Sequence, residues 1–328
     1  MSSARRRDRR RADLGSLTRM SHVDDWREIL VLAAALNSGL LARLAEPAPT
    51  ARLASALGLD PRATRITIAA LTDRGWCVER DGRVGLTPRA CSAIGPDPED
   101  PVLAEVLLAT REITAYQQLE TTLHTGAPSH DVSAGDTATR RRFLEAMRAI
   151  AARRTAATVG ALPAPAGGGR LLDVGGGPGT YARAFREHGW QVTVIDLPES
   201  LELGGDDLRR WQIDVVAGDI SEGLPAGPWD CVYLGNVIHL FGATVAEELV
   251  RRAGAALVEG GRLAIQEVVG GLAAPAALFG VAMLVGTRDG EVYDQATYAR
   301  WMDAAGCPLE RVVATEPERH HLLLGTRR

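Results

Sequence analysis

The chain has 328 residues, of which 46% are apolar and 24% charged; this excludes a single small domain and also a disordered or collagen-like chain. The formal net charge is -4 and the pI is about 6.0, so the overall charge attracts neither nucleic acid nor an anionic membrane. The four cysteines are widely spaced with no CxxC pair, which predicts no disulfide framework and no zinc site and favours a cytoplasmic protein.

The chain begins with an arginine-rich segment, with arginines at 5–7 and 9–11. No apolar stretch follows it directly, so it is not typical of a secretory signal. We expect residues 1–20 to form a disordered basic tail, although an arm that binds nucleic acid has the same composition.

Residues 21–165 are predicted to be a helical domain that contains a winged helix. Helix, turn and helix are expected over 50–57, 58–61 and 62–74. Two short β-prone runs at 76–80 and 83–86 follow, joined by Asp-Gly, a strong hairpin signal.

Further helices are expected over 29–44, 102–123 and 139–159. The first is apolar on more than one face, so we predict that it is covered by a second copy of the chain in a homodimer. A linker rich in Pro, Ala and Gly, residues 162–169, ends this half.

Residues 166–328 are predicted to form an α/β domain with a mostly parallel sheet. Strand-like runs at 170–174, 191–195, 213–216, 230–234 and 262–268 alternate with helical patterns. Two last runs, 310–315 and 320–325, are only four residues apart, too close for a crossover helix, so they must be antiparallel. The uncharged stretch 268–287 is long enough to span a membrane, but Pro275 and its glycines favour a strand end, a loop and a core helix.

A glycine loop follows the first of these strands. Gly175, Gly177 and Gly179 stand between the strand and the next helix, and a threonine replaces the glycine that would complete a dinucleotide-binding GxGxxG. Asp173 at the strand end would repel a pyrophosphate but suits the cationic amino-acid and sulfonium end of S-adenosylmethionine.

Two more aspartates follow the next two strands. Asp196 lies about 20 residues after the loop, where a carboxylate can accept both hydroxyl protons of a ribose. Asp219 is placed to accept a hydrogen bond from the adenine amino group. Because the ends of parallel strands meet at one edge of a sheet, the three carboxylates predict an S-adenosylmethionine site.

At this point residues 24–328 resemble the S-adenosylmethionine-dependent small-molecule O-methyltransferases of the plant caffeic acid and acetylserotonin type and the bacterial polyketide-tailoring type. The matching segments are LLDVGGGPG at 171–179, VIDLP at 194–198, Gly218-Asp219, NVIH at 236–239, Gly260-Gly261-Arg262, Glu267, Met283-Leu284-Val285 and Tyr293. The resemblance implies a class I methyltransferase fold, with a Rossmann-like sheet ending in an antiparallel hairpin, preceded by a winged-helix dimerisation domain. It also implies an obligate homodimer, metal-independent chemistry, an aromatic or polyketide-like substrate bound between the halves, and Leu197, Ile220 and Asn236 beside the cofactor.

The same resemblance implies that His239 is the general base, oriented by Glu267. A histidine with a pKa near 6.5 is suited to removing the proton of a phenol. The substrate-lining positions fall on Phe143, Met147 and Met283. Two positions depart from the family pattern: Leu240 follows the histidine, and the second flanking glutamate of the plant enzymes falls on Val292.

These departures leave other functions open. A family member could bind the cofactor and carry out hydroxylase or pericyclase chemistry, or methylate nitrogen or carbon. A winged-helix DNA-binding regulator is a third class, but only Arg62 and Arg65 lie early on the helix that would contact DNA.

Overall fold

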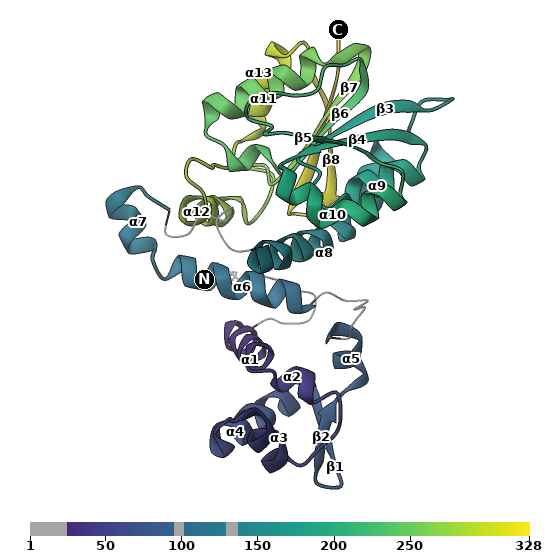
Figure 1. The fold of residues 1–328 in the computed structure, drawn as a ribbon. Coiled ribbons are helices and arrows are strands. Elements are labelled where there is room, and N and C mark those ends of the chain that lie inside the picture. Colours follow the sequence, from purple (N-terminus) through teal and green to yellow (C-terminus); the bar gives the residue numbers. More distant parts are fainter. Residues whose placement is uncertain (1–24, 95–101, 129–136) are drawn as a thin grey trace, which may run out of the picture.

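The computed structural model describes residues 25–94, 102–128 and 137–328 (Figure 1). The predicted basic tail over 1–20 lies outside this range. The winged helix is present as predicted: α3 (Thr50–Leu57) and α4 (Pro61–Asp73) are followed by the antiparallel pair β1 (Cys77–Arg80) and β2 (Arg83–Leu86). Asp60 begins α4, because its side chain accepts a hydrogen bond from the amide of Ala63.

Two predicted helices are interrupted. The helix expected over 29–44 is α1 (Trp26–Asn37) followed by α2 (Leu40–Arg43), because Gly39 adopts a left-handed φ of 76° that ends the first helix. The helix expected over 102–123 is α6 (Val102–Tyr116) followed by α7 (Leu119–Thr125). There the amide of Gln118 donates to the carbonyl of Ala115, a tightened turn that ends α6.

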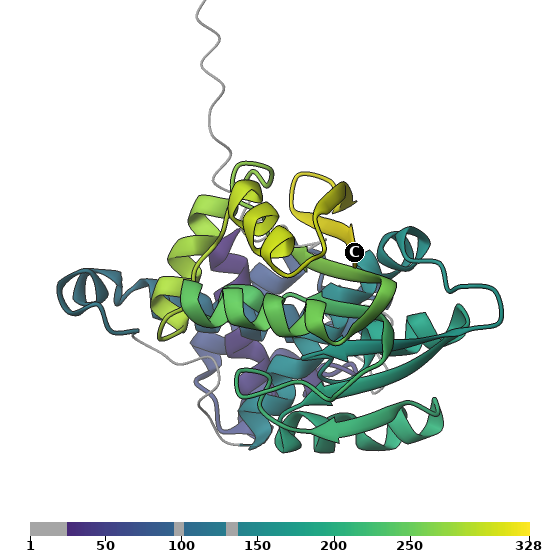
Figure 2. The same cartoon turned by 90° about the horizontal axis from the view of Figure 1, so that it is seen from above.

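Long helices connect the two halves of the molecule. After α5 (Pro88–Ile94), α6 contacts α1 on one side and α8 (Thr137–Ala161) and α12 (Ala276–Gly286) on the other. α8 also contacts α9 (Thr180–Glu187) and the strand β8 (Leu309–Glu316). Figure 1 shows α6 and α8 between the winged-helix part and the sheet, and Figure 2 looks from above with the N-terminal helices beneath the α/β part. Because α8 packs on both halves, the boundary at 165/166 stays a prediction.

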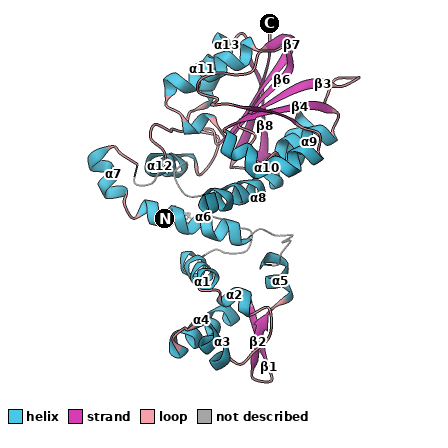
Figure 3. Ribbon diagram, in the orientation of Figure 1, coloured by secondary structure: helices cyan, strands magenta, loops and turns pink. Residues whose placement is uncertain are grey.

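The second half is built on one seven-stranded sheet (Figure 3). The strand order is β5-β4-β3-β6-β7-β9-β8, and only β9 runs antiparallel to its neighbours β7 and β8, as predicted. The remaining strands are β3 (Gly169–Val174), β4 (Trp190–Asp196), β5 (Asp214–Ala217), β6 (Trp229–Gly235), β7 (Leu257–Glu267) and β9 (His320–Thr326). β7 is longer than expected: Gly260, with a left-handed φ of 77°, lies within it rather than in a turn before it.

Both faces of the sheet are covered, which explains the apolar runs in its strands. Leu172 of β3 packs in a core with α11 (Ala243–Ala255) and α13 (Gln295–Ala304), whereas its neighbour Leu171 packs with α8, α9 and α10 (Pro198–Arg210). The helices leave the carboxyl ends of the strands to loops, and this is the edge where ligands bind in open α/β sheets.

The stretch 268–287 forms a loop, with an isolated bridge from Gly270 to Asp294, and the helix α12; the expected strand end is wrong, because β7 ends at Glu267, just before the stretch. In the part of the chain that the structure describes, no helix combines the length and the apolar character needed to cross a membrane.

Candidate active site

A tight glycine loop joins β3 to α9. Gly175, Gly177 and Gly179 adopt φ values of 69°, 50° and 81°, a left-handed backbone that glycine alone takes without strain. A Cβ atom at Gly176 would lie 2.8 Å from the Asp173 carboxyl carbon. The loop therefore folds closely over Asp173, with Gly177 and Gly179 buried and Gly175 and Gly176 partly exposed.

Asp173 lies beneath this loop and is 1% exposed. Burial, together with the nearby charge of Asp196, raises the pKa of Asp173 to about 7. Among the described residues no group donates a hydrogen bond to its Oδ2. An acceptor buried without a donor is unfavourable unless a ligand supplies one, so this position fits the cationic end of S-adenosylmethionine.

Asp196 at the end of β4 fixes the loop. Its Oδ2 accepts a hydrogen bond from the amide of Gly177 and its Oδ1 one from the amide of Leu197, each at 2.7 Å. Burial raises the pKa of Asp196, and these two hydrogen bonds oppose the shift. A carboxylate has about four acceptor sites, so both oxygens can still accept the hydroxyl groups of a ribose.

The other predicted cofactor residues lie at the same edge. Asp219 is exposed, and its Oδ1 accepts from the amide and hydroxyl of Ser221 at 2.8 and 2.7 Å. A Cβ at Gly175 would lie 3.6 Å from the Ile220 side chain. Asn236, just after β6, has a left-handed φ of 59°, and Leu197 is 44% exposed beside Asp196. The structure thus brings together the strand-end residues that were predicted from three separate segments.

His239 lies four residues beyond β6, in the short 3-10 helix η2 (Ile238–Leu240), rather than at the strand end itself. Its Nδ1 is 2.6 Å from Oε2 of Glu267, which is fully buried at the end of β7. Oε1 of Glu267 accepts the amide of Ile238 at 2.9 Å. Because a carboxylate can only accept, Nδ1 carries the proton of a neutral His239 and Nε2 is left as the basic nitrogen.

The second flanking glutamate of the plant enzymes has no carboxylate equivalent beside His239 among the residues that this structure describes. Val292 packs with Val268, Ala273 and Phe279 in a small apolar cluster. Glu291 has an exposed side chain, and its amide donates to the carbonyl of His239 at 3.0 Å. Glu267 is therefore the carboxylate that bonds His239 among the described residues.

The candidate substrate residues lie on two helices. Met283 is buried on α12 and Met147 is half-buried on α8. Phe143 falls within α8, but its side chain lies outside the described residues. Phe279 was not predicted: its ring meets the His239 ring edge-on, with centroids 5.0 Å apart. The sequence pattern that could have indicated Phe279 is its spacing of four residues from Met283, which places both side chains on one helix face.

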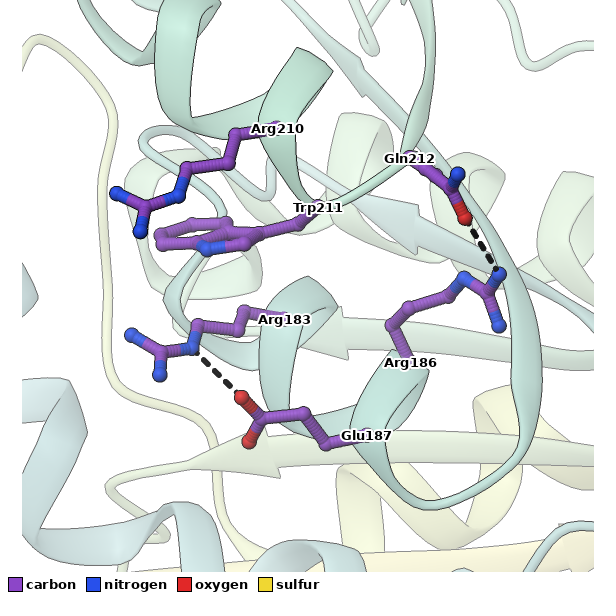
Figure 4. A pocket seen from close by; sticks show the side chains of 6 residues that line it. All are labelled: Arg183, Arg186, Glu187, Arg210, Trp211 and Gln212. Atoms are coloured by element: carbon purple, nitrogen blue, oxygen red, sulfur yellow. Dashed lines mark hydrogen bonds and ion pairs between the residues drawn. The ribbon is translucent and has the colours of Figure 1, made fainter.

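A surface hollow lies elsewhere, lined by Arg183, Arg186, Glu187, Arg210, Trp211 and Gln212 (Figure 4). These residues belong to the second half of α9 and the end of α10, next to the start of β5. The hollow lies on the outer side of α9 and α10, and Trp211 in its lining is 3.7 Å from the position that a Cβ of Gly179 would take. Two contacts join its lining residues: Arg183 pairs with Glu187 at 2.8 Å, and Arg186 donates to the amide oxygen of Gln212 at 3.2 Å. Within the described residues no three His, Cys, Asp or Glu side chains are grouped to hold a metal, and metal independence remains an expectation.

Comparison with known proteins agrees with this geometry. A family model described as a methyltransferase domain matches residues 140–312. The chain is 32% identical over 308 residues to a 3-hydroxy-5-methyl-1-naphthoate 3-O-methyltransferase of Streptomyces sahachiroi, covering 86% of both chains. It is 28% identical over 296 residues to the tetracenomycin polyketide synthesis 8-O-methyl transferase TcmO of Streptomyces glaucescens, covering 84% of this chain and 86% of that one. A solved structure described as PigF with SAH shares the fold, with a TM-score of 0.78 at 22% identity over 92% of this chain and 96% of that chain.

Proposed function

We propose that this chain, which belongs to the S-adenosylmethionine-dependent O-methyltransferases, methylates a phenolic hydroxyl of an aromatic or polyketide-type small molecule with His239 as general base. The cofactor, when bound, supplies an electrophilic methyl group. The observation that carries the proposal for His239 is its 2.6 Å contact with the buried Glu267. The names of the two Streptomyces relatives, a naphthoate and a polyketide O-methyltransferase, support the substrate class.

Residues at three strand ends would each bind a different part of the cofactor. Asp173 and the loop over Gly175, Gly177 and Gly179 would hold the cationic amino-acid end, since Asp173 has an unpaired buried oxygen. Asp196 would accept the ribose hydroxyls, and Asp219 the adenine amino group. Leu197, Ile220 and Asn236 would border the adenosine.

His239 would then act on the acceptor alone. Nε2 takes the phenolic proton, and Glu267 holds the ring in place and stabilises the imidazolium that forms. Most of the rate enhancement comes from holding the phenol oxygen in line with the transferred group, since such positioning is worth about 7 to 11 kcal/mol. Phe143, Met147 and Met283 would border the acceptor.

The O-methyltransferase relatives favour oxygen over nitrogen or carbon as the acceptor, and methylation over hydroxylase or pericyclase chemistry.

We also propose a homodimer formed through the N-terminal half. Light scattering tests this, because a monomer that is active at micromolar concentration contradicts it. A DNA-binding role is not supported, and salt-dependent binding to duplex DNA is the measurement that would revive it.

The reaction is tested with cofactor carrying a labelled methyl group and a panel of naphthols and polyketide phenols, with products analysed by mass spectrometry. We expect a labelled aryl methyl ether from at least one phenol. Transfer of label only to nitrogen or carbon acceptors, or binding of the cofactor without any methylated product across the panel, contradicts the proposal.

A further inference from the structure

One face of α6 bears three polar side chains, on the side of the helix that contacts the α/β half of the chain. We call this face the polar stripe. Glu105, Glu112 and Tyr116 are spaced by seven and four residues, which places them on one helix face. The neighbouring apolar face, with Val106 and Ala109, packs in the N-terminal core with α1. The polar stripe is therefore directed away from that core.

Both ends of the stripe are fixed to elements of the other half. Glu105 is buried and forms an ion pair with Arg153 of α8. The hydroxyl of Tyr116 donates a hydrogen bond to the carbonyl of Leu278 on α12 at 2.8 Å. Leu278 precedes Phe279, whose ring contacts His239. Glu112, between the two anchors, therefore lies on the face of α6 that contacts α8 and α12.

The carboxyl of Glu112 has no ion pair or hydrogen bond with any residue in the described ranges, unlike that of Glu105. Surrounding protein raises its pKa to about 7 through desolvation, yet the residue keeps intermediate exposure. A carboxyl group that is largely surrounded by protein but still reached by solvent can meet a small-molecule ligand. A carboxyl left unpaired there is unfavourable unless a ligand pairs with it.

We propose that Glu112 determines acceptor specificity by accepting a hydrogen bond from a second donor group of the substrate, a hydroxyl or an ammonium, distinct from the hydroxyl that is methylated. This rests on the proposed function of the same site. The preferred acceptor is then an aromatic compound with at least two donor groups. An acceptor carboxylate is disfavoured, because it would face a second carboxyl group.

The test compares a dihydroxynaphthalene, an (aminomethyl)naphthol whose amine is protonated at neutral pH, a naphthol with one hydroxyl and a hydroxynaphthoate as acceptors for the wild type and the Glu112→Leu variant. Leucine removes both acceptor oxygens at similar size, and loss of an unpaired, desolvated carboxyl should leave thermal stability unchanged or higher. The wild type is expected to prefer the acceptors with two donors. In the variant, the ratio of kcat/KM for the dihydroxynaphthalene to that for the naphthol should fall about tenfold or more.

Glu120→Gln, at an exposed carboxyl on α7, is the matched control and should leave the ratio unchanged. The two acceptors with second donors separate hydroxyl from ammonium recognition. An unchanged ratio in Glu112→Leu, or no preference in the wild type, overturns the proposal.

Failure of the proposed reaction is distinguished by binding. If no phenol is methylated, the dissociation constants of the same compounds are measured by calorimetry with S-adenosylhomocysteine present. A tenfold weaker binding of the dihydroxynaphthalene to Glu112→Leu then supports Glu112 even though the reaction is wrong, and equal binding overturns it.

Discussion

Two carboxyl groups in this molecule share a pKa raised to about 7, Asp173 beneath the glycine loop and Glu112 on α6. Desolvation is the main cause for both, but Asp173 also lies near a second carboxylate, Asp196, whereas burial is the one cause that acts on Glu112. Asp173 is covered by the glycine loop, and Glu112 lies on the face of α6 that contacts α8 and α12. The same shift thus arises in two different settings, and the ligands that we propose for them differ: a cation at the strand ends and a neutral or cationic donor at the helices.

The comparison divides the site into a cofactor side at the ends of β3, β4 and β5 and an acceptor side made by α6, α12 and His239. If the division is right, substitutions on each side change different constants. The cofactor side should alter cofactor affinity, and the acceptor side kcat or the acceptor KM.

The largest effect is expected for His239→Ala on the acceptor side. Loss of a general base lowers the rate by about 10² to 10⁴, so kcat should fall in that range while the dissociation constant of the cofactor is unchanged. Steady-state kinetics and calorimetry measure the two. Glu291→Gln, at an exposed side chain whose amide contacts His239, should leave both unchanged. Near wild-type turnover by His239→Ala shows that positioning alone drives the reaction.

The next effect is expected for Asp196→Ala on the cofactor side. Hydrogen bonds to a charged group contribute about 1.5 to 3 kcal/mol, so cofactor affinity should fall about ten- to hundredfold. Asp196→Asn keeps one acceptor oxygen and should lose less, which separates ribose recognition from loosening of the loop at Gly177. Asp206→Ala, at an exposed carboxylate on α10, is the control. Unchanged affinity in Asp196→Ala removes Asp196 from the site.

A smaller effect follows from the pKa of Asp173. A cationic ligand favours the ionised carboxyl, so the pKa of Asp173 should be lower in the complex than its value of about 7 in the free protein. Cofactor affinity is then full above pH 7 and falls below it, by at most about tenfold per pH unit. Calorimetry between pH 5.5 and about 7.5 stays below the usual pKa of an α-amino group. In Asp173→Asn the dependence of cofactor affinity on pH should become weaker. If the wild type and Asp173→Asn show the same dependence, the proton that is released on binding belongs to another group.

The two sides also differ in how far the sequence predicts them. Asp173, Asp196 and Asp219 each follow a recognisable strand, and parallel strands bring their ends to one edge whatever the details of packing. Glu112 and Phe279 lie on helices whose neighbours depend on how two halves of the chain pack, and periodicity gives a face but not its partner. The breaks at Gly39 and Gln118 were missed for a related reason, since an apolar pattern continued across both.

The smallest effect tests the acceptor side at Phe279. Its ring meets the His239 ring edge-on at 5.0 Å, and such aromatic contacts contribute about 0.5 to 1.5 kcal/mol beyond the area they bury. Phe279→Leu keeps most of the apolar volume but removes the ring, so kcat/KM for the phenol should fall about two- to twelvefold. Cofactor affinity should not change, because Phe279 lies on α12 rather than at a strand end. Leu284→Ala, at a 38% exposed position of the same helix, controls for a general disturbance of α12. If His239 needs the ring to hold its orientation, kcat falls in Phe279→Leu and the acceptor KM does not; a change in KM alone makes Phe279 a wall of the acceptor site instead.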